Sequence, residues 1–184
     1  FFYDYEKSFD FDNFIDNDFT LKLQKTSKDT YLKKNKITSD IAFDENILEN
    51  SAKLKFSKED LFINFETYAY EDLNKNNSDR YEYILPKIDL SKKIDNKTKL
   101  NGDFFINSKI VNKSYNTNIF ETININDLKF ESLPWITQKG FYNSYEFLIK
   151  NANTDANNSE LLKNKNKNYL LGLLQLNSSI PMAK

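Results

Sequence analysis

The stretch KLKFSKEDLFINFETYAYEDL, residues 53–73, decides the fold class because its apolar and polar side chains alternate with a period of two. Two alternating runs flank a polar turn at residues 57–60. One set of alternate side chains in the second run is mainly apolar: Leu61, Ile63, Phe65, Thr67 and Ala69. The other set mixes aromatic rings with amide and carboxylate groups: Phe62, Asn64, Glu66, Tyr68 and Tyr70. The pattern predicts a β-hairpin whose two faces meet different surroundings.

The same period recurs along the whole chain. Eight segments read as strands: 19–25, 51–56, 61–71, 80–90, 103–115, 118–131, 140–150 and 169–180. Pro86 is a flaw in the hydrogen-bond ladder of the fourth segment. Because the 184 residues include only 3 Gly and 3 Pro, we expect clusters of Asn, Asp, Lys and Ser to form the turns. We therefore expect an all-β, antiparallel meander of seven to nine long strands with almost no helix.

The length of these segments bears on the surroundings of the sheet. Strands of soluble domains are most often about 5–6 residues long, whereas a tilted membrane-spanning strand needs about 9–11. The connectors alternate imperfectly between short and long, as they do in outer-membrane barrels. Aromatic rings lie near expected strand ends, where membrane and water would meet: Tyr68, Tyr70, Tyr81, Tyr83, Tyr115, Trp135, Phe141 and Tyr169.

One face of the expected sheet suits lipid and the other suits water. We predict that the lipid-facing side carries Leu61, Ile63, Phe65, Phe104, Ile106, Phe147 and Ile149. Glu66, Glu82, Glu121 and Glu146 then lie on the opposite, hydrated face. That face is too polar to fill a small closed barrel with packed side chains. We therefore expect an open arc of a large transmembrane β-barrel, in which segments 19–25 and 169–180 do not pair.

Composition excludes several classes of function. The net charge is −1, from 26 basic and 27 acidic residues, so no strong field attracts nucleic acid. The chain has no Cys and no His, which excludes a thiol nucleophile, a zinc cluster and a Ser-His-Asp triad. No run of about 18 apolar residues exists that could form a transmembrane helix. We expect no catalysis, no cofactor and no metal.

Four kinds of charged cluster are candidate catalytic, metal-binding or lipid-binding sites. Carboxylate pairs occur at Asp10 and Asp12, Asp16 and Asp18, Glu59 and Asp60, and Glu71 and Asp72, but a glycosidase needs its two carboxyls across a cleft. The stretch 10–18 lacks the Gly and Glu of a calcium loop. Lysine runs at 32–37 and 161–168 either meet lipid phosphates or are ordinary exposed loops. The four glutamates of the hydrated face either line a conduit or contact a plug protein. No substrate path is assigned to particular residues.

Several stretches resemble the LPS-assembly protein LptD (OstA) family of the alphaproteobacterial type. DFTLKLQKTSKDTYLKKNKI (18–37) is similar to a strand and the Ser-Asp-Asp-Thr segment after it, with Lys28 in place of the first acidic residue. SDRYEYILPKIDL (78–90) resembles a strand with a Leu-Pro element, and residues 101–130 resemble the following hairpin. LPWITQKGF (133–141) and LGLLQLNSSIPMAK (171–184) complete the series in the family's order.

The resemblance implies a non-enzymatic translocon in the bacterial outer membrane that inserts lipopolysaccharide into the outer leaflet. Its implied partners are lipopolysaccharide, outer-membrane lipid, an LptE-like plug lipoprotein and, through an N-terminal jellyroll domain, a periplasmic LPS-bridge protein. Residues 1–184 would be part of the barrel domain, without that jellyroll and without the remaining strands. The family's gate prolines do not map onto Pro86, Pro134 or Pro181.

Two alternatives stay open from the sequence. The first is another outer-membrane β-barrel, a porin or receptor, whose lumen passes solutes. The second is a soluble all-β adhesion or carbohydrate-binding module, which would have a single buried core. Only the LPS-export barrel predicts a jellyroll domain and many further strands in the full gene.

Overall fold

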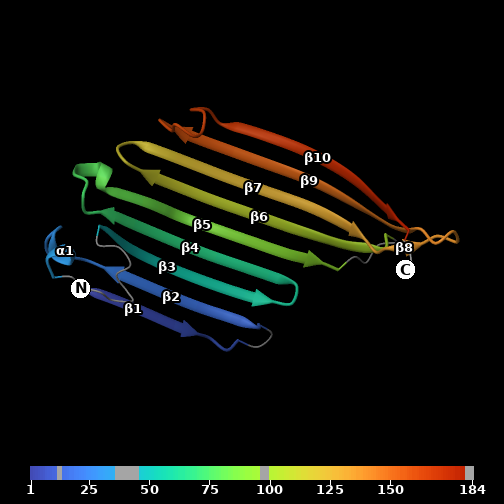
Figure 1. Cartoon of the computed structure of the whole chain (residues 1–184), viewed down its shortest axis with the longest axis horizontal. Helices are drawn as coiled ribbons and strands as arrows, with labels where there is room; N and C mark the ends of the chain where they lie inside the picture. Colours follow the sequence, from blue (N-terminus) through green and yellow to red (C-terminus); the bar gives the residue numbers. More distant parts are fainter. Residues whose placement is uncertain (12–13, 36–45, 96–99, 181–184) are drawn as a thin grey trace.

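The strands of this chain lie side by side in a single layer, seen in a computed structural model (Figure 1). The structure describes residues 1–11, 14–35, 46–95 and 100–180. The strands are β1 (Phe2–Ser8), β2 (Asp16–Gln24), β3 (Ile47–Lys58), β4 (Leu61–Asp72), β5 (Tyr81–Ile94), β6 (Gly102–Tyr115), β7 (Ile119–Ser132), β8 (Trp135–Ile136), β9 (Tyr142–Asn157) and β10 (Lys167–Ser179). A short helix α1 (Tyr31–Asn35) and a 3₁₀ turn η1 (Asn77–Arg80) complete the described elements.

The strands follow one another as an antiparallel meander. Their order in the sheet is β1-β2-β3-β4-β5-β6-β7-β9-β10, and the two-residue β8 pairs with β9. All eight predicted segments form strands, and nine strands have 7 or more residues. Sequence reasoning missed β1 and β8. The prediction of an all-β meander with almost no helix is confirmed.

The sheet is open. Within the described residues, β1 pairs only with β2, and β10 pairs only with β9. β1 and β10 form the two opposite edges of the sheet (Figure 1). The segments 19–25 and 169–180 therefore do not pair, as predicted, and the sheet forms an arc without closing on itself.

The connectors lie at two ends of the sheet. We call the end with the 59–60 turn the hairpin end, and the end with α1 and residues 116–118 the helix end. The strand pairs β1–β2, β3–β4, β5–β6 and β7–β9 are joined at the hairpin end, and β2–β3, β4–β5, β6–β7 and β9–β10 at the helix end. Each end has both short and long intervals between strands, so the alternation of connector lengths stays imperfect. Asparagine takes the left-handed backbone conformation in the connectors of the helix end: Asn77 (φ 56), Asn116 (φ 47), Asn118 (φ 62) and Asn158 (φ 56).

The flaw predicted at Pro86 is a bulge inside β5. The pairing of β4 with β5 shifts between Glu66 and Tyr68, and that of β5 with β6 shifts between Ile84 and Lys87. Proline has no N–H to donate to a neighbouring strand, and the bulge that accommodates it interrupts the ladders with both β4 and β6.

Strand register assigns every side chain to one of two faces. Leu61 pairs with Lys92, which pairs with Ile106. Ile106 continues to Leu128 and Ile149. By this alternation the seven residues predicted to share a face do so: Leu61, Ile63, Phe65, Phe104, Ile106, Phe147 and Ile149. We call this the apolar face, and we call the opposite face, which carries Asn64 and Glu66, the charged face.

No second layer covers either face among the described residues. Only five apolar side chains there are buried: Leu32, Leu48, Leu73, Phe130 and Ala156. Leu32 of α1 packs with Leu48 and Leu73, so the small core sits at the helix end, over the first strands. None of the helices in the described ranges has the length and apolarity that a membrane span requires.

The close pairing of β6 with β7 leaves no space at Gly102. A Cβ atom added there would lie 2.3 Å from the carbonyl oxygen of Glu131 and 2.6 Å from the ring of Phe130. Gly102→Ala should therefore lower the free energy of unfolding by about 1–3 kcal/mol. Urea denaturation of the chain, followed by the fluorescence of Trp135, measures this change. Gly172→Ala is the control, because no atom lies within 4 Å of its added Cβ. Equal midpoints for the two variants would contradict the packing described.

Candidate functional site

Cross-strand ion pairs occupy the charged face. Lys87 contacts Glu66 at 2.6 Å, Lys93 contacts Asp103 at 2.8 Å, Lys113 contacts Glu82 at 3.0 Å and Lys150 contacts Asp127 at 2.9 Å. Lys129 lies between two carboxylates, Glu131 and Glu146. Each such cross-strand pair of opposite charges gains about 0.2–1 kcal/mol over a pair of small neutral residues. The pairs also give this face a mixture of positive and negative charge.

The four glutamates expected on the hydrated face all lie on the charged face, and each has a partner. Glu66 also accepts hydrogen bonds from Asn64 (2.9 Å) and Tyr68 (3.0 Å). Glu121, which is 7% exposed, accepts hydrogen bonds from the hydroxyls of Tyr115 and Ser159. Each of these carboxylates therefore belongs to the cross-strand network of the charged face.

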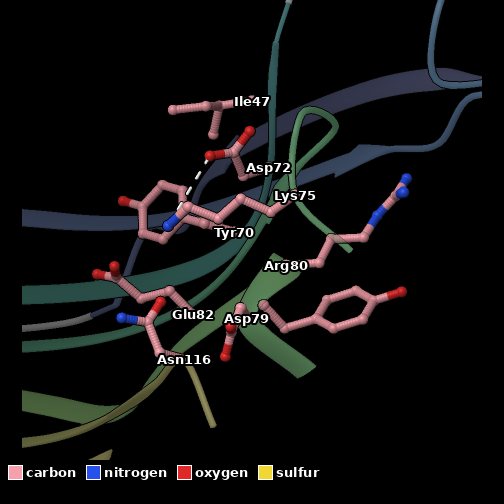
Figure 2. Close-up of a pocket in the computed structure, with 9 residues that line it drawn as sticks. Ile47, Tyr70, Asp72, Lys75, Asp79, Arg80, Glu82 and Asn116 are labelled. Carbon is pink, nitrogen blue, oxygen red and sulfur yellow. Dashed lines mark ion pairs between the residues drawn. The ribbon is translucent and has the colours of Figure 1, made fainter. Parts of the chain in front are cut away.

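A hollow opens at the helix end, where the ends of β3, β4 and β5 meet the connections 73–80 and 116–118 (Figure 2). Its lining residues are Ile47, Tyr70, Asp72, Lys75, Asp79, Arg80, Tyr81, Glu82 and Asn116. Asp72 and Lys75 face each other at 4.0 Å, the contact drawn in Figure 2. Asp79 accepts a hydrogen bond from Thr117 (2.6 Å), and Glu82 pairs with Lys113. The hollow brings opposite charges together in pairs, which ties the connectors to one another.

Arg80, the only arginine in the chain, joins the loop before α1 to the sheet. Its guanidinium donates two hydrogen bonds to Asp29 (2.6 and 3.0 Å) and a third to Glu71 (2.7 Å). This bidentate geometry suits arginine and not lysine. The hydrogen bonds from Arg80 lower the pKa of Asp29, and those to Asp29 raise the pKa of Arg80. The clamp holds α1 over the end of β4.

Among the remaining candidates in the described residues, four carboxylates have separate partners. Asp16 and Asp18 lie on the charged face of β2, beside Lys55 (3.7 Å) and Ser8 (2.8 Å). Glu71 binds Arg80 and Asp72 faces Lys75, so this pair is divided between two cations. Asp12 and residues 36–37 of the first lysine run lie outside the described residues. In the part of the chain that the structure describes, no three Asp or Glu side chains gather as metal ligands would.

Sequence reasoning missed a patch of uncharged polar side chains on the apolar face. It is formed by Ser108, Asn112, Thr122, Asn124, Asn126, Asn151, Asn153 and Asn168, which share that face in the register of β6, β7, β9 and β10. We call it the amide surface. The signal was present, because asparagine recurs at alternate positions in 122–126 and 151–153. Only the register brings these strands together.

No model of a known protein family matches the chain, and a search of the curated proteins finds no relative.

Acid should release the Arg80 clamp. A lowered pKa for Asp29 means that the clamp stabilises the fold above the unfolded pKa, about 3.9, and that this contribution is lost as the pH falls through the lowered folded value. Asp29→Asn should therefore raise amide hydrogen exchange in α1 at pH 7, whereas the unmodified chain should show this only in stronger acid. Asp16→Asn is the control, because its Lys55 contact is long and far from α1. Unchanged exchange in Asp29→Asn would refute the clamp.

Proposed function

We propose that this chain is part of the wall of a large outer-membrane β-barrel, and that the barrel exports lipopolysaccharide to the outer leaflet. The proposal for the membrane rests on the shape of the apolar band, and the proposal for the cargo rests on the family resemblance. No catalytic step is part of it.

The apolar band crosses the strands obliquely. On β4 the band spans Leu61–Ala69, and its midpoint is Phe65. Following the paired residues from Phe65 across the sheet leads to Asn168 on β10. The band on β10 spans Leu170–Leu176, so its midpoint at position 173 is displaced five residues toward the hairpin end over five strand steps. On β2 the midpoint is Leu21, whose row reaches Thr67, two residues from Phe65 over two steps. The displacement has the same direction throughout.

A displacement of about one residue per strand corresponds to a definite tilt. With about 3.4 Å per residue and about 4.8 Å between strands, the band is inclined by about 35° to the perpendicular of the strands. Strands of membrane barrels tilt by about 35–45°. Eight residue steps from Leu61 to Ala69, projected at this tilt, give a band about 22 Å tall, close to the roughly 25 Å of outer-membrane barrels. This oblique band is the observation that carries the membrane proposal.

The small core argues against the soluble alternative. A soluble module must bury one face of its sheet, whereas apolar side chains on this sheet stay exposed, among them Phe65 (39%), Phe147 (38%) and Leu174 (74%). Lipid would cover them. The open edges of β1 and β10 need further strands to satisfy their backbone groups inside a membrane.

The cargo assignment depends on the five stretches that resemble the LPS-assembly family in order. The proposed partners rest on the same resemblance: lipopolysaccharide, an LptE-like plug, a periplasmic LPS-bridge protein and outer-membrane lipid. In the porin or receptor alternative the chain is also part of a barrel wall, but small solutes cross the barrel in place of lipopolysaccharide.

Adjacent substitutions on β4 test the membrane assignment. In the intact gene product refolded into vesicles, Ile63→Arg should cost about 2–4 kcal/mol of unfolding free energy, because it places a charge near the middle of the lipid-facing band. Asn64→Arg points the same side chain to the charged face, between Lys55 and Asp89 in register, and should change stability far less. Urea unfolding measures both, and equal losses would count against a lipid-facing Ile63.

Depletion of the intact gene product in its own bacterium tests the cargo. Lipopolysaccharide newly reaching the cell surface should fall and that remaining in the inner membrane should rise, measured by surface labelling and membrane fractionation. Re-expression of the intact gene is the control. Normal surface lipopolysaccharide with reduced solute uptake would support the porin alternative instead.

A further inference from the structure

The amide surface begins where the apolar band ends. Along β6 the change falls between Ile106 and Ser108, and along β7 between Leu128 and Asn126, which pair with them. On β9 it falls between Ile149 and Asn151, again in the same rows. Across these three strands the first polar side chains share one register row, with Ile110 and Phe120 beyond it, and the amide surface lies on the helix-end side of that row.

The amide surface has unused hydrogen-bonding capacity. Ser108 donates to Asn126 (2.7 Å), Asn126 donates to Asn124 (3.0 Å), and Asn153 donates to Asn151 (2.6 Å). Asn112, Asn124 and Asn168 accept hydrogen bonds from neighbouring side chains. Within the described ranges their own side-chain N–H groups have no acceptor. These donors are available to a partner that approaches the apolar face.

The chemistry of the two borders of the band differs. Lysines of the apolar face lie at the hairpin-end border, at Lys7, Lys58 and Lys92. The eight side chains of the amide surface are uncharged, and the charge beside them on the same face is the carboxylate of Asp155, which pairs with Thr122 and repels phosphate. Amides and hydroxyls both donate and accept, as sugar hydroxyls do. A neutral saccharide is the headgroup that fits this border.

Exposed aromatic rings border the amide surface on the same face. Tyr83 pairs with Ser114, which pairs with Phe120, and the two rings are 38% and 40% exposed. The negative face of an aromatic ring attracts the C–H groups of a sugar ring. Rings beside amides therefore give both kinds of contact that a saccharide uses.

We propose that the amide surface binds the neutral saccharide headgroup of a lipid whose acyl chains lie against the adjoining apolar band. The proposal rests on the proposed membrane location. It makes the helix end of the sheet the saccharide side, and it makes the outer surface of the wall a recognition surface as well as a solvent boundary.

The test uses the intact gene product in phosphatidylcholine vesicles with increasing digalactosyldiacylglycerol, a neutral diglycosyl lipid. Ser114→Cys carries an environment-sensitive fluorophore beside the amide surface; residues 1–184 contain no other cysteine, and any cysteine elsewhere in the gene product is replaced by serine. We expect a saturable emission shift. Adding Asn124→Ala and Asn153→Ala should weaken the apparent affinity about tenfold or more, because several hydrogen bonds are lost. The matched control is Asn107→Ala with Thr154→Ala on the charged face, which should keep the affinity.

Three further samples separate the sources of a signal. Phosphatidylglycerol in place of the glycolipid should give no saturable shift, and an equal shift would overturn the proposal in favour of anionic attraction. Free lactose should give no shift, and an equal shift would overturn the lipid-bound assignment. A label at Ile63→Cys reports insertion by oxygen quenching. Without insertion both proposals fall, whereas insertion with no response to the glycolipid overturns this one alone.

Discussion

A single-layer sheet has only its neighbouring strands to satisfy its backbone and only its surroundings to cover its faces. Each internal strand is paired on both sides, and the register runs through nine strands without a crossover. Both faces are therefore exposed to the surroundings of the sheet, and the side chains on each face must suit those surroundings. The apolar rows, the ion-pair rows and the amide rows are three ways in which side chains do so.

The charged face shows how such a boundary is stabilised without a core. Four of its lysines contact carboxylates on a neighbouring strand, and Lys129 bridges the directly opposed Glu131 and Glu146. Each pair is weak, but a slip of register by one residue would move every charge to the other face. The ladder thus contributes more to the choice of register than to total stability.

Much of the fold could be predicted because strand periodicity is a local signal. The alternation in 61–71 identified β4 and both of its faces, and the missing N–H of Pro86 located the bulge. β1 was missed although Phe1, Tyr3 and Tyr5 alternate with Asp4 and Glu6, because its aromatic residues lie next to a turn-rich segment. The amide surface and the Arg80 clamp could not be predicted. Both depend on register between strands, or on a contact between Asp29 and Arg80, 51 residues apart.

The order of the strands has a kinetic consequence. Long strands, whose pairs are mostly adjacent in sequence, close few long loops, so each new strand can add to an existing edge at low entropic cost. Growth of this kind has a direction, because the most recent strand is always the template for the next. β10 has leucines on both faces and pairs only with β9 in the described sheet, so its other edge can bind a further strand or another chain. The time for which this edge stays unpaired, and not the stability of the finished sheet, then sets how often folding ends in aggregation.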